Sequence, residues 1–251
     1  MVAVEPRGAR WDVEAWGAGP VEARSAVRKM FSLDHPLEEF YRLVRLEPVL
    51  SGTDRRFRGL RLPRDANLYE ALLHAIVGQQ LSVSAANALK RRLFYETSSV
   101  ITAGGFEVPC VPTPDRLREL GVDGIRRLGI SGAKARALAQ IAADLDRLAV
   151  LERNLAAGPV EAAVATLTEL PGVGPWTAEN ALLRGVGRPD VFVAGDLGLR
   201  VALDEYGAVP RSAPETRARA WCERHYPRWG SYATLYLWRK LVDDRARAAG
   251  G

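Results

Sequence analysis

Residues 170–178 read Leu-Pro-Gly-Val-Gly-Pro-Trp-Thr-Ala, and this stretch decides the fold. An apolar segment ends at Leu170, and Pro175 suits the first turn of a new helix. Gly172 and Gly174 permit a tight turn whose N–H groups face outward, next to the positive end of that second helix. Such a turn can hold a phosphate without reading any base. An ordinary corner between two helices also carries glycine, so the stretch alone leaves both interpretations open.

The sequence on both sides of this turn is predicted to be helical. Asn67 caps one helix, with Glu70 three residues later as in a capping box. Residues 78–80, Gly-Gln-Gln, then interrupt an apolar stretch, which indicates two helices joined by a tight polar turn. Thr-Pro at 113–114 marks a further helix start. Apolar spacing of three and four residues predicts more helices over 133–151, 160–170, 175–184, 197–206, 214–225 and 232–247.

The N-terminal residues are harder to assign. Glycine and proline break up residues 1–25, and a strand predicted over 10–16 has no obvious partner nearby. The fold class that follows is all-α.

The composition indicates a folded and mildly basic protein. The 251 residues are 47% apolar, which is enough for a real core, and the formal charge is +5 with a pI near 9.5. A modest polyanion binder has such a charge, as do many proteins that bind no nucleic acid. Cys110 and Cys222 are too few for a disulfide framework or a cysteine-only metal site. No apolar run suits a membrane span or a signal peptide, so we expect a cytoplasmic protein with no membrane partner.

An acidic residue follows the second helix of the turn. Residues 190–200 read Asp-Val-Phe-Val-Ala-Gly-Asp-Leu-Gly-Leu-Arg, which places Asp196 at a helix start, directly after a glycine and 20 residues past Trp176. Aspartate is a common helix N-cap, and that role is compatible with a catalytic one.

With this aspartate in place, the chain resembles the helix-hairpin-helix (HhH-GPD) DNA glycosylases. Within that superfamily it is most similar to the AlkA-type 3-methyladenine DNA glycosylases. The resemblance covers residues 26–242, and its further motifs are Ala-Ile-Val-Gly-Gln-Gln-Leu-Ser at 75–82, Pro-Thr-Pro at 112–114, Leu-Gly-Ile-Ser at 128–131 with Lys134, and Trp-Gly-Ser-Tyr at 229–232.

The resemblance implies a role for Asp196 in breaking the bond between a damaged base and its sugar. Its carboxylate would stabilise the oxocarbenium-like sugar and position the attacking water. Base flipping is required, because the glycosidic bond cannot be reached inside a stacked duplex.

The resemblance also implies an aromatic base pocket. Trp176 and Trp229, with Tyr232, match aromatic positions of the family, and a cationic alkylated purine over an indole face gains about 0.5–2 kcal/mol. Asn180 stands where relatives often carry an aromatic, which predicts a more polar or roomier pocket. For the other tryptophans, Trp221 and Trp238, we expect core packing.

Three further segments are candidates for DNA contacts. The backbone of Gly172, Val173 and Gly174 would hold a phosphate, and an ion could bind the hairpin carbonyls of Leu170 and Gly172. Gln80, or failing that Leu81, would fill the stack vacated by the flipped base, unless residues 79–81 form an ordinary polar turn. Lys134 either contacts a phosphate or is simply solvated, and the solvated alternative is favoured because most surface lysines are solvated.

Trp176 excludes one mechanism. In the related glycosylase/lyases this hairpin position is a lysine that attacks the sugar, and an indole cannot do that. The C-terminal part of this sequence contains a single cysteine, Cys222, whereas the iron–sulfur loop of those relatives needs four, so that cluster is ruled out. We therefore expect a monofunctional enzyme without a cofactor that acts on double-stranded DNA containing a damaged base, as a monomer associated with the nucleoid.

The family's N-terminal β-domain is expected to be absent or reduced, with activity retained. Two helical subdomains would flank the DNA cleft: residues 30–67 with 190–251 carry the aspartate, and residues 68–189 carry the hairpin, after an N-terminal extension over 1–29. A glycosylase for another lesion, mismatched or oxidised, and a non-catalytic DNA-binding module remain as alternatives.

Overall fold

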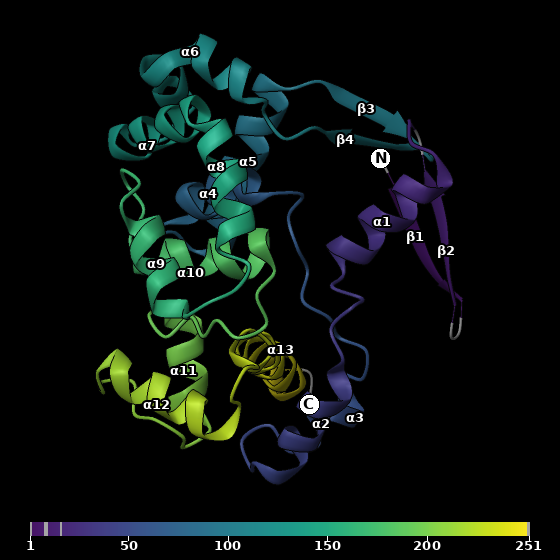
Figure 1. The fold of residues 1–251 in the computed structure, drawn as a ribbon, viewed down its shortest axis with the longest axis vertical. Helices are drawn as coiled ribbons and strands as arrows, with labels where there is room; N and C mark the ends of the chain where they lie inside the picture. The colour runs from purple at the N-terminus through teal and green to yellow at the C-terminus, as the bar shows by residue number, and fades with distance from the viewer. Residues whose placement is uncertain (1, 8–9, 16, 250–251) are drawn as a thin grey trace.

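A computed structural model describes residues 2–7, 10–15 and 17–249. This part of the chain is mostly helical, as expected (Figure 1). The helices are α1 (Pro20–Met30), α2 (Leu37–Leu46), α3 (Thr53–Arg56), α4 (Leu68–Gly78), α5 (Val83–Thr97), α6 (Pro114–Arg127), α7 (Gly132–Ala143), α8 (Leu145–Asn154), α9 (Val160–Thr168), α10 (Pro175–Ala181) with the π-helical turn η1 (Leu182–Val186), α11 (Leu197–Glu205), α12 (Glu215–His225) and α13 (Gly230–Ala249).

Side-chain caps fix several helix starts where the sequence predicts them. The Asn67 side chain accepts a hydrogen bond from the Glu70 N–H at 2.9 Å, and α4 begins directly after it. The Thr113 hydroxyl accepts one from the Arg116 N–H at 3.2 Å at the start of α6. Each cap satisfies an N–H group that the first helical turn leaves without an intrahelical partner.

The helix predicted over 133–151 is two helices. The chain breaks at Asp144, whose φ of −102° and ψ of 27° lie outside the α region, so α7 ends at Ala143 and α8 starts at Leu145. The Asp144 carboxylate accepts a hydrogen bond from the Gln140 side chain at 3.0 Å. Aspartate bonds readily to neighbouring groups in non-helical conformations, which an apolar-spacing pattern does not register.

The helices pack around two apolar cores. The first core lies among α4 to α10, and the second lies among α2, α11, α12 and α13. Figure 1 shows these two groups one above the other, with α10 and α11 at their junction. The two cores support the division into subdomains, and its boundaries stay a prediction. Fully buried members are Leu72, Ile76, Leu138 and Ile141 in the first core, and Phe40, Leu50, Tyr232 and Tyr236 in the second.

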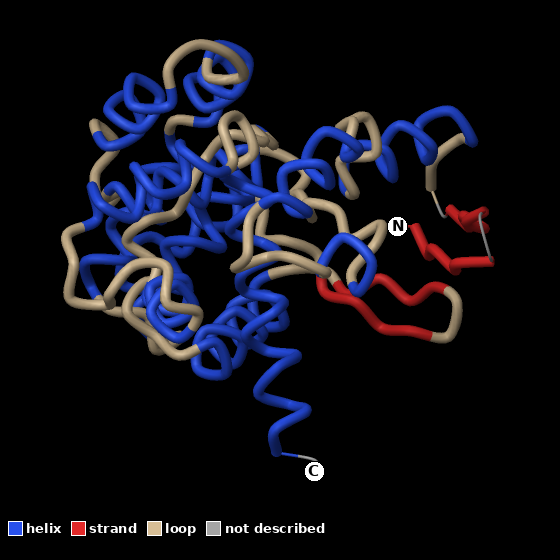
Figure 2. Tube along the Cα trace, turned by 90° about the horizontal axis from the view of Figure 1, so that it is seen from below, coloured by secondary structure: helices blue, strands red, loops and turns tan. Residues whose placement is uncertain are grey.

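Two short β-hairpins project on the same side of the helical body (Figures 1 and 2). In the first, β1 (Val2–Arg7) pairs antiparallel with β2 (Arg10–Ala15). The expectation that the strand over 10–16 lacks a nearby partner is therefore wrong. A proline within Val2–Arg7 weakens the strand pattern, and such a residue is tolerated at a sheet edge. The second hairpin, β3 (Val100–Ala103) with β4 (Phe106–Pro109), was not predicted.

Candidate active site

The hairpin between α9 and α10 is shaped by one glycine rather than two. Gly172 has a φ of +78°, and a Cβ added there would lie 2.6 Å from the Ala137 Cβ on α7. Gly174 has a φ of −91° and a ψ of 176°, which is extended backbone that any residue adopts, and a Cβ there would meet nothing within 4 Å. Only Gly172 is required by the turn and by the close approach of α7.

The other hairpin residues contribute through their backbone. Leu170 and Val173 bury their side chains in the first core, and the Val173 N–H donates to the Leu170 carbonyl at 3.1 Å. The Gly172 carbonyl accepts a hydrogen bond from the Gln79 side chain at 2.9 Å. Both carbonyls named as candidates for an ion thus already accept a hydrogen bond within the chain.

Asp196 is the N-cap of α11. Its Oδ1 accepts a hydrogen bond from the Leu199 N–H at 2.9 Å, and the side chain is half-buried. The capping role expected for this aspartate is therefore present, and it places the carboxylate at the positive end of a helix.

Two indoles also hold the Asp196 carboxylate. Trp176 Nε1 donates to Oδ2 at 3.1 Å from α10, and Trp238 Nε1 donates to Oδ1 at 2.9 Å from α13. Together with the cap, three N–H donors from three helices fix the orientation of the carboxylate. Each indole also contributes a large apolar ring beside the charge.

Trp238 was expected to pack in the core, and its indole N–H additionally contacts Asp196, a role that was not expected. It packs against the second core while remaining partly exposed. Asp196 and Trp238 are 42 residues apart. No local pattern in the sequence links two positions at that separation.

A cavity of about 960 Å³ adjoins this carboxylate. It brings together Asp196, Trp176 and Gly174 with Gln80, Leu81 and Lys134 from the other side. Part of the hairpin, the polar turn and the acid therefore share one space, whereas Gly172 and Val173 do not line it. The remaining lining residues are Gly78, Gln79, Ser82, Ser131, Ala133, Thr177, Gly195 and Leu197.

Other proposed pocket residues do not line this cavity. Trp229 is 5% exposed and Tyr232 is fully buried, and their rings pack with Phe40 in the second core. The Tyr232 hydroxyl lies 2.9 Å from His35 Nδ1. Asn180 points along its own helix and donates to the Trp176 carbonyl at 2.9 Å. The structure thus places all three away from the space beside Asp196.

Lys134 is not an isolated solvated side chain, so the favoured expectation for it is wrong. Its Nζ donates to the carbonyls of Val77 and Gln79 at 2.9 Å and 2.7 Å. Partial burial lowers the pKa of the Lys134 ammonium below its ordinary value. The sequence places Lys134 55 residues after Gln79, so this contact has no local signature.

An ion pair with a buried carboxylate links α10 to α12. Glu179 on α10 is 1% exposed and accepts a hydrogen bond from Arg219 on α12, whose guanidinium also donates to the Phe192 carbonyl at 3.1 Å. Burial raises the pKa of Glu179 to about 7, although Arg219 acts in the opposite direction. The pair joins a helix of the first core to a helix of the second, and sequence analysis did not find it.

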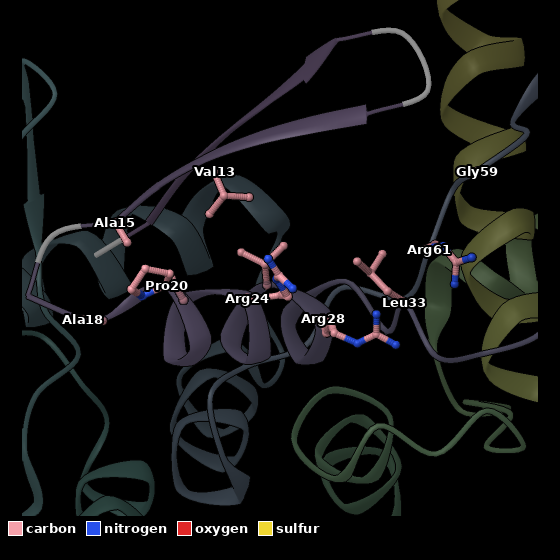
Figure 3. A pocket seen from close by; sticks show the side chains of 11 residues that line it. Val13, Ala15, Ala18, Pro20, Arg24, Arg28, Leu33, Gly59 and Arg61 are labelled. Atoms are coloured by element: carbon pink, nitrogen blue, oxygen red, sulfur yellow. The ribbon is translucent and has the colours of Figure 1, made fainter.

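A second cavity, of about 750 Å³, lies between β2 and α1 (Figure 3). Its lining includes Arg24, Arg28 and Arg61 together with apolar residues such as Val13 and Leu33. Among the described residues that line it there is neither a sequence-predicted site residue nor a carboxylate.

The described residues contain no group of three or more His, Cys, Asp or Glu side chains placed to hold a metal ion. Within the same residues, every helix is too short or too polar to cross a membrane.

Comparison with protein families gives one match over most of the chain. The model of the HhH-GPD superfamily base excision DNA repair protein matches residues 73–227. This range contains the hairpin, the 78–82 turn, Lys134 and Asp196.

Individual relatives agree with the family match. The "Probable bifunctional transcriptional activator/DNA repair enzyme AlkA" of Mycobacterium tuberculosis is 31% identical over 87% of this chain and 42% of its own length. "DNA-3-methyladenine glycosylase 2" of Escherichia coli is 35% identical over 72% and 60%. The chain thus spans less than two thirds of either relative. Among solved structures, the 3-methyladenine DNA-glycosylase from Archaeoglobus fulgidus superimposes with a TM-score of 0.83 at 25% identity, covering 96% of this chain and 82% of that one.

Proposed function

Since the chain belongs to the HhH-GPD superfamily of base excision DNA repair proteins, we propose that it is a DNA N-glycosylase that hydrolyses the bond between a damaged base and its sugar. The observation that carries this proposal is the Asp196 carboxylate, held by two indoles at the edge of the cavity that the hairpin also lines. A helix cap alone would not need two tryptophans from other helices.

The reaction uses the cavity beside Asp196. A nucleotide flipped out of the duplex enters it, the glycosidic bond breaks, and the base leaves with the bonding electrons. Asp196 offsets the positive charge that develops on the sugar. Water then adds to C1′, and its proton passes to Asp196 or to solvent. A cationic alkylated base leaves as a neutral molecule and needs no proton, whereas a neutral base must take one up to complete the hydrolysis.

The substrate we propose is an alkylated purine. Such a base carries a positive charge, which makes it a good leaving group and attracts it to an indole face by about 0.5–2 kcal/mol. Trp176 lines the cavity and offers that face. Support also comes from the relatives named as 3-methyladenine glycosylases. Deaminated purines belong to the same proposed substrate class, and a glycosylase for another lesion, a mismatched or oxidised base, is the alternative.

We further propose that the hairpin backbone at Gly172–Gly174 binds a phosphate of double-stranded DNA. No side chain caps α10, so its first N–H groups are available to an anion. We also propose that the protein acts as a monomer on the DNA of the nucleoid. Because Trp176 has no amine, the product is an intact abasic strand.

The experiment is base release from duplexes that each carry one defined lesion. Asp196→Asn should bind DNA like the wild type and lose about 10²–10³ in excision rate, as expected when one electrostatic partner of a developing charge is removed. Asp204→Asn, at an exposed position of the same helix, serves as the matched control and should retain full activity. Wild-type rates in Asp196→Asn would contradict the assignment. DNA binding without base release by the wild type would favour the non-catalytic module.

A further inference from the structure

The turn over 78–82 holds one residue in an unusual backbone conformation. Gln80 is exposed and has a φ of +55°, in the left-handed region that side chains other than glycine rarely adopt. Leu81 beside it is 41% exposed. Such a conformation costs free energy and persists only where the surrounding structure imposes it. The contacts of this turn show what imposes it.

Lys134 holds the turn from one side. It lies in the first turn of α7, where a cation opposes the positive end of its own helix. Its ammonium instead reaches the end of α4 and donates to the Val77 and Gln79 carbonyls at 2.9 Å and 2.7 Å. Carbonyls at a helix C-terminus lack intrahelical partners and attract a cation. The Lys134 side chain therefore stabilises the end of α4 and the turn that follows it, rather than its own helix α7.

Gln79 ties the turn to the hairpin. Its Nε2 donates to the Gly172 carbonyl and to the Thr177 hydroxyl, both at 2.9 Å. The hairpin is held to α7 as well, because Ala137 lies so close to Gly172 that a Cβ there would be 2.6 Å away. Lys134 and Ala137 stand three residues apart on α7 and thus on one face. The 78–82 turn, α7 and the hairpin are therefore fastened pairwise to one another.

We propose that Lys134 and Gln79 are positioning residues that hold Gln80 in place for insertion into the base stack while the hairpin holds the DNA backbone. This inference rests on the proposed function, since insertion matters only to a protein that flips a base. It assigns Lys134 a role other than nucleophile. An ammonium that donates to two carbonyls has no free electron pair with which to attack a sugar.

The test compares binding to an intact duplex with binding to the same duplex carrying a tetrahydrofuran abasic-site analogue. The gap in the second duplex accepts Gln80 without base flipping, so the wild type should prefer it. Lys134→Met and Gln79→Leu should each reduce this preference about tenfold or more, the size expected for loss of a charged or buried hydrogen bond. Lys134→Arg, which can still donate to both carbonyls, should restore it.

Lys90→Met is the matched control, because Lys90 is also half-buried but lies on α5 outside the cavity. It should leave the preference unchanged. Thermal unfolding of each variant checks folding, and Gln79→Leu still tests the proposal if Lys134→Met does not fold. An unchanged preference in the folded variants would overturn the proposal.

Excision assays separate this inference from the proposed function. The variants should lose more activity on a lesion in a well-stacked pair than on one opposite a mismatch, which costs less to unstack. An equal loss in both contexts would overturn the positioning role. Efficient borohydride trapping of the wild type on DNA, abolished in Lys134→Arg, would also overturn it by making Lys134 the nucleophile. A wild type that releases no base refutes the proposed function, while the binding preference still decides the positioning role.

Discussion

At the scale of single residues, the site depends on how Asp196 is held. Each carboxylate oxygen accepts one indole N–H, from Trp176 or from Trp238, so neither oxygen is free to rotate away. The two tryptophans act on the same charge from different helices. Trp229 has no such contact and packs among the aromatic rings of the second core.

The first prediction separates these two kinds of tryptophan. Trp238→Phe should keep the fold and lower the excision rate about 10- to 100-fold, because it removes a hydrogen bond to a charged carboxylate. Trp229→Phe should leave the rate near that of the wild type and lower the free energy of unfolding by about 1 kcal/mol. Single-turnover excision and thermal unfolding of both variants provide the measurements. A larger rate loss in Trp229→Phe would place that ring in the base pocket.

Asp196 and the hairpin could be predicted from the sequence because their signals are local. The aspartate follows a glycine at a helix start, and the hairpin glycines stand between two apolar helices. Trp238 and Lys134 could not be predicted, since their partners lie 42 and 55 or more residues away. The motif match led to the choice of Trp229 for the base pocket, and a matching motif does not show that this side chain is buried in the second core.

At the scale of elements, the hairpin is a rigid connection between α9 and α10. Its shape depends on Gly172, whose positive φ and contact with Ala137 leave no room for a side chain. Gly174 caps α10 in an extended conformation with open space around it. The two glycines of one motif therefore tolerate change very differently.

The second prediction is a comparison of alanine substitutions. Gly172→Ala should lower the free energy of unfolding by about 1–3 kcal/mol, the range for a strained backbone residue, and should weaken binding to unrelated undamaged duplexes alike. Gly174→Ala should unfold like the wild type. Denaturant unfolding and binding to two duplexes of different sequence test this. Weakened binding to only one of the two sequences would argue against a phosphate contact.

Elements themselves were predictable where a cap or proline marks them. Asn67 and Thr113 start helices as expected, because a capping side chain needs only its own neighbours. The pairing of β1 with β2 depends on contacts across a turn in a segment rich in glycine and proline, and a strand pattern shows no partner. The break at Asp144 depends on one side chain that competes with the helix.

At the scale of the whole molecule, the two cores meet along α10, where the buried Glu179 pairs with the partly exposed Arg219. Glu179 Oε2 has no hydrogen-bond partner within the described residues. The buried carboxylate is poorly solvated, and its interaction with Arg219 offsets only part of the free energy lost by removing the charge from water. The junction between the cores is therefore sensitive to the protonation state of Glu179.

The third prediction follows from the raised pKa of Glu179, about 7 against an ordinary 4.5. The folded state binds this proton more tightly than the unfolded state, so the contribution of Glu179 to the free energy of unfolding is fully present below about pH 4.5 and is lost as the pH rises through 7. The full difference corresponds to about 3 kcal/mol. Glu179→Gln should flatten this part of the urea-unfolding profile, whereas Glu215→Gln should change it only slightly, because Glu215 is the smallest of the causes that shift the Glu179 pKa. Parallel profiles for the wild type and Glu179→Gln would refute the prediction.

The division of the second core between the two ends of the chain has a consequence for synthesis. Tyr236 on α13 donates to the Phe57 carbonyl at 3.1 Å across 179 residues, and Arg56 pairs with Asp243 and Asp244. The ribosome completes the entire first core before α13 emerges. At ordinary translation speeds, the apolar face of α2 waits roughly 10 to 40 s for its partner. During that interval the nascent chain exposes surface that a chaperone can cover, and the second core can close only after α13 has emerged from the ribosome.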